Sequence, residues 1–518
     1  MVCKLCKIEN LLFCLLCFVS IFFYSHHMTD TYIVPKWCFT FLVLLVGFFV
    51  LSIKKLCNKI IRIDVVACGC VIILITFCQA IYGIGQWFQW IPSIGHYKIV
   101  GSFDNPAGFA SCLCIGFPFV ALCLKLAKDT LLRVLLYLLA SIIILAVILS
   151  ESRTGIMSIL VVVGIYYWHY VPLKRRTKTI VLTGVFFLLL GVSYFLKKDS
   201  ADGRLLIWKC SWEMIKDSPV YGHGISSFRT HYMDYQAHYF EQYPDSKYSM
   251  LADNVLCPFN EYLAVLVNFG FLGFFILLAF IFILLFCYYK QPGDDKRAAL
   301  LSLLGVGVFS LFSYPFTYPF VWIIVCFDIY ILLKRVGHWV FALIYKKSLC
   351  VILIIFCLGF SYRLYQRIEA EYRWNDIAYL HATDESLGVY KSLMPVLGSN
   401  PYFLYNYAVA LLDVDSLDES LDKALRCRTY WADYELELLL GNIYERQRKY
   451  EMAEICYKNA SFMCPCRFIP LYQLFKLYQK TNDKEKFQVV SKLIIEKHVK
   501  VPSSLVRRIK YKVKQEKN

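Results

Sequence analysis

The sequence lacks the short motifs that mark the common soluble enzymes. It holds no phosphate-binding P-loop, no Gly-x-Gly-x-x-Gly dinucleotide fingerprint and no Gly-x-Ser-x-Gly nucleophile elbow. The stretch from Gly83 to Trp87 has two glycines only, and it lies at the edge of an apolar run. These absences argue against a P-loop nucleotidase, a dinucleotide-dependent oxidoreductase and an α/β-hydrolase.

Metal-ligand spacing is also missing, although the chain has 22 cysteines. Most of these cysteines lie inside apolar runs, where a thiol behaves as a small hydrophobic group. Cys464 and Cys466 are separated by a single proline, which is too tight for half of a zinc site and would strain a disulfide. We therefore expect incidental thiols, with no metal and no cofactor.

Charged residues are scarce, at 18%, whereas hydrophobic residues make up 58% of the chain and mean hydropathy is +0.53. Repeated apolar runs approach the length of about 20 residues that a helix needs to cross a bilayer. About eleven spans are predicted, at residues 11–24, 37–53, 65–84, 107–124, 131–149, 155–170, 179–196, 262–289, 298–312, 316–333 and 348–360. No small-residue cleavage site precedes His26, so we expect the first span to be a helix of the protein and not a signal peptide.

Basic residues gather in alternate short loops of the predicted bundle and are nearly absent from the other short loops. The basic loops lie at residues 54–62, 125–128, 174–178, 290–297 and 334–335. Because basic loops stay in the cytoplasm, we expect a cytoplasmic N-terminus, with residues 197–259 and everything after Tyr362 on the periplasmic side. The net charge of +17 follows from this topology, so nucleic acid is not an expected partner.

After Phe360 the apolar runs give way to charged and apolar residues at helical spacing, which indicates a second, water-soluble domain. Seven residues of one segment match the 34-residue tetratricopeptide pattern, namely Leu440, Gly441, Tyr444, Ala453, Tyr457, Ala460 and Pro465. The sequence thus predicts an all-α protein, with a transmembrane helical bundle at 1–361, a large periplasmic loop at 197–259, and a periplasmic α-solenoid of tetratricopeptide-like repeats at 362–518. The solenoid is either a surface for a protein partner or a rigid cap on the membrane domain.

Three polar segments fall on the same predicted, periplasmic side. Residues 101–106 read G-S-F-D-N-P, residues 151–155 read E-S-R-T-G, and the long loop reads R-L-L-I-W and D-S-P-V-Y-G-H-G, with N-E-Y-L following it before G-F-L-G. With these motifs, residues 1–360 resemble the O-antigen ligase/polymerase superfamily. The resemblance implies a metal-independent transferase of the cell inner membrane, which takes glycan from a polyprenyl-diphosphate carrier. The implied acceptor is lipid A core, a growing glycan chain or a protein hydroxyl.

Arg153 and Arg204 are the candidate diphosphate-binding residues. Displacing a diphosphate from a sugar builds negative charge on the leaving group, and the planar guanidinium can donate two hydrogen bonds to phosphate oxygens. Arg153 lies beside a predicted membrane span, where a charged side chain is costly unless it has a function or a partner. An ion pair with Glu151 or simple snorkelling stays open as the alternative for Arg153, and a structural role stays open for Arg204.

The catalytic base is in doubt because the sequence departs from the ligase pattern. In that pattern a histidine precedes a polar residue, but here Phe259 precedes Asn260. Glu261, at the start of a helix, and His223, between two glycines, are the candidate bases. The alternatives are a carboxylate that merely favours a helix start for Glu261, and a turn residue for His223.

Positioning roles are expected for three polar residues. Asp104 and Asn105 precede Pro106 in a turn that should cap the following helix. Asn260 occupies the polar position of the ligase pattern, so we expect a positioning role for it as well.

An aromatic series in the long loop falls on one helix face, and consists of Phe228, Tyr232, Tyr235, Tyr239 and Tyr243. These rings could stack on sugars or guide the polyprenyl chain. They could instead rest a helix on the membrane interface.

A non-enzymatic protein is the competing hypothesis, either a transporter of lipid-linked glycan or a membrane scaffold that recruits partners through its repeats. A transporter should show inverted internal repeats and charged residues at mid-membrane depth, and neither is evident. The residues therefore favour a membrane glycosyltransferase whose partners are the lipid-linked glycan, an acceptor and membrane lipid. The identity of the acceptor is left open.

Overall fold

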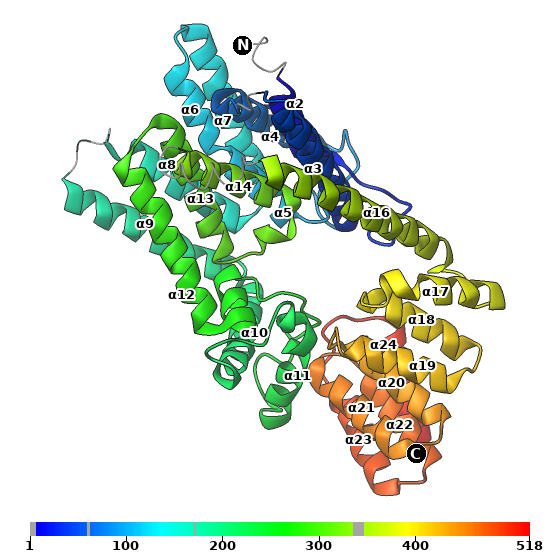
Figure 1. Ribbon diagram of the computed structural model, residues 1–518. Coiled ribbons are helices and arrows are strands. Elements are labelled where there is room, and N and C mark those ends of the chain that lie inside the picture. Colours follow the sequence, from blue (N-terminus) through cyan, green and yellow to red (C-terminus); the bar gives the residue numbers. More distant parts are fainter. Residues whose placement is uncertain (1–6, 60–62, 170–171, 173, 335–346, 518) are drawn as a thin grey trace. The chain divides into compact units, whose positions relative to one another are not determined.

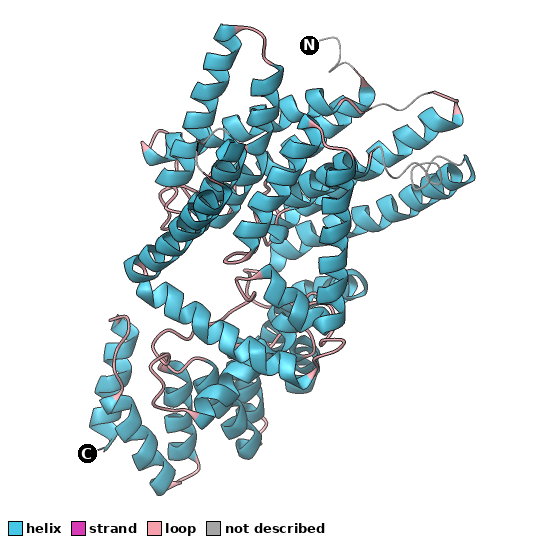
Figure 2. Cartoon of the chain, turned by 90° about the vertical axis from the view of Figure 1, so that its left-hand side faces the viewer, coloured by secondary structure: helices cyan, strands magenta, loops and turns pink. Residues whose placement is uncertain are grey.

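The computed structural model describes residues 7–59, 63–169, 172, 174–334 and 347–517. Every regular element in these residues is a helix, as Figure 2 shows by colour, so the all-α prediction is confirmed for this part of the chain. Backbone contacts divide the chain into two units. We call Met1–Phe195, Phe259–Glu261 and Phe275–Tyr372 the membrane unit, and Leu196–Pro258, Tyr262–Phe274 and Arg373–Asn518 the repeat unit.

Figure 1 labels the helices of both units. The membrane unit contains α2 (Ile8–Phe22), α3 (Ile33–Leu56), α4 (Val65–Trp87), α5 (Pro106–Gly116), α6 (Pro118–Leu126), α7 (Thr130–Leu149), α8 (Arg153–Tyr166), η1 (Tyr167–His169), α9 (Arg175–Leu196), α13 (Asp294–Ser310), η2 (Pro315–Thr317) and α14 (Pro319–Leu333). The repeat unit contains α10 (Lys198–Asp217), α11 (Ser227–Gln242), α17 (Asp384–Leu397), α18 (Pro401–Asp413), α19 (Leu417–Arg428), α20 (Tyr434–Arg446), α21 (Tyr450–Met463), α22 (Ile469–Lys480), α23 (Lys484–Glu496) and α24 (Ser504–Lys517). Both α12 (Glu261–Lys290) and α16 (Lys347–Ile377) have residues in each unit, and the last residue of α9, Leu196, also belongs to the repeat unit.

Six helical segments among the described residues are long and apolar enough to cross a membrane: Ile33–Leu56, Val65–Trp87, Pro106–Leu126, Thr130–Leu149, Glu261–Lys290 and Ser348–Ile377. Helices α2, α8 and α14 are apolar but shorter. The prediction of a multi-pass membrane protein is confirmed, whereas the number of eleven spans stays a prediction. The third of the six segments is interrupted between α5 and α6, where Pro118 has no N–H for a helical hydrogen bond.

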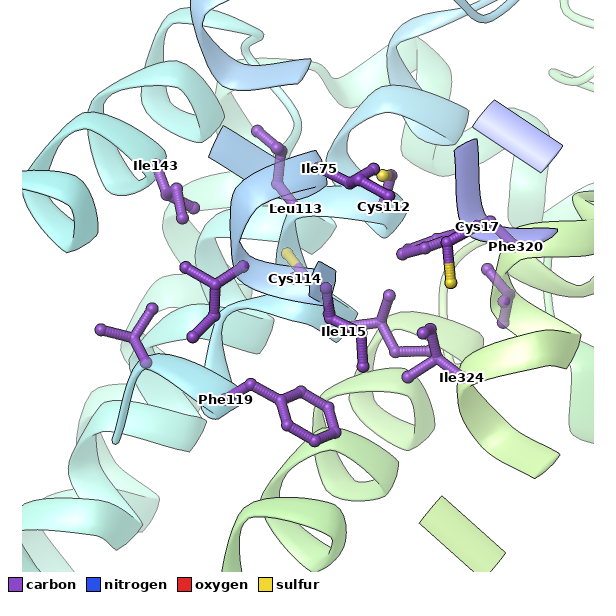
Figure 3. Close-up of a cluster of buried hydrophobic side chains, with 14 of the residues drawn as sticks. Cys17, Ile75, Cys112, Leu113, Cys114, Ile115, Phe119, Ile143, Phe320 and Ile324 are labelled. Atoms are coloured by element: carbon purple, nitrogen blue, oxygen red, sulfur yellow. The ribbon is translucent and has the colours of Figure 1, made fainter. Parts of the chain in front are cut away.

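Helix α5 lies at the centre of the membrane unit, and its residues from Gly108 to Gly116 are all buried. Figure 3 shows Cys112, Leu113 and Ile115 among side chains from α2, α4, α7 and α14. Small residues allow this close packing, since a Cβ on Gly116 would lie 2.1 Å from Thr76 Oγ1. The cysteines of α5 are free thiols buried in this apolar core, where they act as small hydrophobic groups.

The C-terminal helices of the repeat unit pack in consecutive pairs, α18 with α19, α20 with α21, and α22 with α23. They share one apolar core, which includes Leu440 and Tyr457. Gly441 permits a close approach of α20 and α21, because a Cβ there would lie 2.3 Å from Tyr457 Cε1. The helix-pair arrangement agrees with the spacing of the sequence, and the assignment of these pairs as tetratricopeptide repeats stays a prediction.

Helices α10 and α11 of the long loop belong to the same unit as the repeats. Helix α11 packs on α21, and Gln236 Nε2 donates to the Met463 carbonyl at 2.6 Å. The segment after α11 also contacts the repeats, through an ion pair of 2.8 Å between Arg467 and Asp253. The loop is therefore braced by the helices of the C-terminal part of the chain.

Candidate functional site

The loop that precedes α5 is held rigidly by polar side chains from α4. Gln86 Oε1 accepts from the backbone N–H groups of Val100, at 3.0 Å, and Gly101, at 2.7 Å, and Gln86 Nε2 donates to the Gly101 carbonyl at 3.1 Å. Gly101 has a φ of +59°, and a Cβ there would lie 2.0 Å from Gln79 Nε2. Only glycine fits this position, because any side chain would meet both the backbone strain and the Gln79 amide.

A buried lysine from α3 also holds this loop. Lys36 is 1% exposed, and its Nζ donates to the Ser102 carbonyl at 2.9 Å and to the Phe23 carbonyl at 2.8 Å. Ser102 Oγ in turn donates to the Ile21 carbonyl at 2.6 Å. These two bonds join α3 to the loop before α5 and to the end of α2.

Asp104 and Asn105 lie at the end of this loop in a network with two tyrosines. Asn105 is the N-cap of α5, since its Oδ1 accepts from the N–H groups of Ala107 and Gly108 at 2.8 and 3.0 Å. Tyr318 OH donates to Asp104 Oδ1 at 2.8 Å. Asn105 Nδ2 lies 2.8 Å from Asp104 Oδ2, 2.8 Å from Tyr318 OH and 3.2 Å from Tyr314 OH. The Asp104 carboxylate is thus fixed by donors on both oxygens.

The start of α12 meets the same tyrosines. Phe259 packs edge-on against Tyr314, with ring centroids 5.3 Å apart, and has a left-handed backbone with a φ of +52°. Glu261 Oε1 accepts from the backbone N–H of Phe316 at 3.2 Å. Asn260 lies between these two residues. The membrane unit therefore brings Asp104, Asn105, Asn260 and Glu261 to one region around Tyr314, and we call this set the acidic cluster.

Arg153 is the first residue of α8 and is partly buried. Ser152 caps this helix, with its Oγ accepting from the Gly155 N–H at 3.2 Å. Gly155 lets α8 approach α5, because a Cβ there would lie 3.1 Å from Ala110 Cβ. The S-R-T-G hairpin thus holds Arg153 at the end of a helix that packs directly on the centre of the membrane unit.

Arg204 and His223 belong to the repeat unit. Arg204 lies in the second turn of α10 and is partly buried. His223 lies in the turn after α10, and its Nε2 is 2.7 Å from the Met214 carbonyl oxygen. A carbonyl only accepts, so Nε2 carries the proton and a neutral His223 keeps its lone pair on Nδ1.

Two glycines press the His223 turn against the backbone of α12. The N–H groups of His223 and Gly224 donate to the carbonyls of Val267 and Asn268, each at 2.9 Å. Gly222 has a φ of +69°, and a Cβ there would lie 2.5 Å from the backbone of Asn268. Helix α12 is kinked at Gly270, where φ is +61° and ψ is −165°, and a Cβ on Gly270 would lie 2.3 Å from the Val220 oxygen. The glycines of G-H-G and G-F-L-G are therefore required by this contact between two backbones.

The aromatic series of α11 divides between packing and the surface. Phe228 and Tyr232 are buried and stack on each other at 4.5 Å. Tyr235 OH donates to Asp217 Oδ2 at 2.6 Å, and Lys209 lies 4.6 Å from the ring centre of Tyr239. The first two rings thus serve the packing of α11 in the repeat unit, which leaves the later tyrosines for any contact with sugar or lipid.

Sequence reasoning missed Lys36, Gln79 and Gln86, which hold the loop before the acidic cluster, and Tyr314 and Tyr318, which contact the cluster itself. A signal existed for the first three, since a lysine or glutamine inside an apolar span needs a partner or a function. The tyrosines carried no such signal, because aromatic residues are common at membrane interfaces. Within the described residues, no group of three or more His, Cys, Asp or Glu side chains is placed to hold a metal ion. Metal independence stays a prediction.

The comparisons with known proteins point to one family. Residues 138–278 match the family model described as O-Antigen ligase, a stretch that contains Arg153, Arg204, His223 and Glu261. No curated protein sequence matches the chain. Together with the membrane-spanning helices, the match supports an enzyme of membrane polysaccharide biosynthesis, and residues 138–278 are similar to the O-antigen ligases.

Proposed function

We propose that the protein is a metal-independent glycosyltransferase of the O-antigen ligase type, which transfers a glycan from a polyprenyl-diphosphate carrier to an acceptor at the periplasmic face of the inner membrane. The observation that carries the proposal is the family match, whose range includes Glu261 of the acidic cluster. A transporter of lipid-linked glycan or a membrane scaffold is the competing role.

In the proposed reaction, an acceptor hydroxyl oxygen attacks the anomeric carbon of the donor sugar. The bond between that carbon and the diphosphate oxygen breaks, and its electron pair stays on the diphosphate. The hydroxyl proton passes to a base on the protein. Arg153 and Arg204 are the cations proposed to stabilise the departing diphosphate, because a guanidinium can donate two parallel hydrogen bonds to phosphate oxygens.

Glu261 is the preferred base. One of its oxygens is fixed by the Phe316 N–H, and its second oxygen has no hydrogen bond to the described residues. A carboxylate held by one oxygen presents the other in a defined direction, which is what proton removal from a bound hydroxyl requires. His223, with Nδ1 as the accepting atom, is the second candidate.

Asp104 and Asn105 are proposed to position substrate and not to take the proton. Both Asp104 oxygens already accept hydrogen bonds, from Tyr318 and Asn105, so both are engaged in holding the loop. Lys36 is proposed to hold the loop before α5 in place through its hydrogen bond to the Ser102 carbonyl.

The acceptor remains open between lipid A core, a glycan chain and a protein. Phe259 in place of histidine argues against the lipid A ligases, and a helical repeat is a common scaffold for peptides. Deletion of the gene should distinguish a growing glycan chain from the other two acceptors. Loss of chain growth leaves single lipid-linked units, whereas loss of a ligase or of a protein glycosyltransferase leaves complete lipid-linked chains.

The test is transfer by the purified full chain in bilayer discs, with a polyprenyl-diphosphate glycan as donor. Glu261→Gln should abolish transfer and leave donor binding intact, since the arginines hold the diphosphate. Glu213→Gln is the matched control, because Glu213 is exposed and pairs with Lys216 on the same helix. Full transfer activity of both Glu261→Gln and His223→Ala would show that neither residue is the base. A wild-type protein that binds donor but never cleaves it would favour the transporter or scaffold.

A further inference from the structure

The last helices of the repeat unit carry a large excess of positive charge. Residues 476–518 contain thirteen Lys and Arg against four Asp and Glu, whereas residues 384–475 contain nine against thirteen. The residues of α24 alone include six basic side chains and one acidic side chain. The charge is thus concentrated at one end of the repeats.

Only part of this charge is used in packing. Helix α24 lies on the repeat core through Ile509 and Val513, which are 3% and 0% exposed. Lys510 Nζ donates to the carbonyls of Ile495 and Lys497 at 3.0 and 2.7 Å and so ties α24 to α23. The remaining cations of α24 that are described with their side chains are exposed, and they are Arg507, Arg508, Lys512 and Lys514.

These four cations differ from three lysines on the neighbouring helices. Lys458 and Lys486 both pair with Glu454, at 2.6 and 3.1 Å, and Lys480 pairs with Glu445 at 3.2 Å. Within the described part of the chain, none of the four cations of α24 has a carboxylate partner. Like charges on one helix face repel each other, and an anionic surface would relieve that repulsion.

Apolar side chains are exposed among the same cations. Leu505 and Tyr511 on α24 are 48% and 63% exposed, and Val501 just before the helix is 68% exposed. By helical spacing, Leu505 shares a stripe with Arg508 and Lys512, and Tyr511 shares the adjacent stripe with Arg507 and Lys514. Cations flanking exposed apolar groups are typical of a helix that lies on a membrane surface.

We propose that this surface of α24 binds the phosphate headgroups of anionic phospholipids in the bilayer that anchors the chain. The cations fit the phosphates, and Leu505, Tyr511 and Val501 fit the adjoining acyl boundary. The repeat unit is covalently continuous with the membrane helices through α12 and α16, so the local concentration of bilayer is high for every copy. The inference does not depend on glycosyl transfer.

The test uses the full chain in bilayer discs with the photoreactive residue p-benzoylphenylalanine in place of Tyr511. Discs of phosphatidylcholine alone are compared with discs that also contain phosphatidylglycerol, and lipid adducts are counted by mass spectrometry. Ile455 on α21 is the matched control position, since it is 59% exposed and lies on a helix with paired cations. We expect at least about tenfold more phospholipid adduct at 511 in the anionic discs than in neutral discs, and little adduct at 455.

Arg508→Gln with Lys512→Gln should remove this gain, since each cation near an anionic surface contributes about fivefold to binding. High salt should do the same. Lys391→Gln with Lys449→Gln, which also removes two exposed cations of the repeat unit, should leave the gain intact. The proposal fails if the adduct at 511 is no higher than at 455, or if neutral and anionic discs give equal yields. It also fails if a soluble anionic glycan, and not lipid, protects position 511.

Discussion

Gly222→Ala is the change that most directly tests how the His223 turn is held. Gly222 has a left-handed backbone, with a φ of +69°, and the backbone of Asn268 lies 2.5 Å from the point that an alanine methyl would occupy. The obstructing atoms belong to the main chain of α12, so they cannot rotate away as a side chain would. Alanine at this position must therefore push the turn off α12.

The expected cost follows from two terms. A left-handed conformation costs a residue with a Cβ roughly 1–2 kcal/mol, and overpacking against a rigid neighbour costs about 1–3 kcal/mol. Gly224 provides the control, because its φ is +98° while its Cβ would have nothing within 4 Å, so Gly224→Ala meets only the first term. Gly203→Ala on α10, also with open space around it, should be neutral or stabilising.

The assay is amide hydrogen exchange of the full chain in detergent, followed over residues 218–224. The backbone bonds of His223 and Gly224 to α12, each 2.9 Å long, should open with the turn. A local loss of roughly 2–5 kcal/mol speeds exchange by at least about 30-fold in Gly222→Ala, and clearly less in Gly224→Ala. Equal exchange in the two variants would show that contact with the α12 backbone does not hold the turn. If His223 takes part in transfer, activity should fall in the same order.

The remaining predictions concern topology, metal, diphosphate and base. An epitope inserted at Ser200, or added at the C-terminus, should be accessible on spheroplasts without detergent, and a cytoplasmic location of either would overturn the topology. Transfer should survive EDTA, and a loss that magnesium or manganese restores would contradict the metal-free mechanism. Arg153→Lys and Arg204→Lys should each lower the transfer rate about a hundredfold in folded protein, since a lysine ammonium cannot donate two parallel hydrogen bonds to the diphosphate. Near-normal transfer rates in both variants would show that these arginines do not bind the diphosphate. Adding Phe259→His to the Glu261→Gln variant should restore part of the lost transfer activity. No recovery would show that a histidine at position 259 cannot act as the base in this protein.

Features governed by local sequence were predictable. The composition indicated the membrane class, and the helix-pair rhythm after Phe360 is present in α18 to α23. Asn105 before a proline is a helix cap by its own chemistry, and it caps α5 as expected. In such cases the residues that decide the structure lie within a few positions of one another.

Features that join distant segments were not predictable. Lys36 reaches Ser102 across 66 residues, Tyr318 reaches Asp104 across 214, and Gln236 reaches Met463 across 227. Local sequence patterns do not predict such contacts, because each residue is compatible with its own helix or loop whether or not the distant partner is present. The assignment of α10 and α11 to the repeat unit was missed for the same reason, since it rests on the packing of α11 against α21.

Phe259 shows how the departure from the ligase pattern is accommodated. Its φ of +52° lies in a region that bulky residues rarely adopt and that His, Asn and Asp adopt more often. Such a conformation costs roughly 1–3 kcal/mol and persists only where its surroundings enforce it. Here the ring packs on Tyr314, and the next turn of chain places Glu261 against the Phe316 N–H. The backbone therefore keeps a geometry suited to histidine although the side chain has no proton-accepting atom. A base two residues further on can then use the same local frame, which is why Glu261 is preferred to His223.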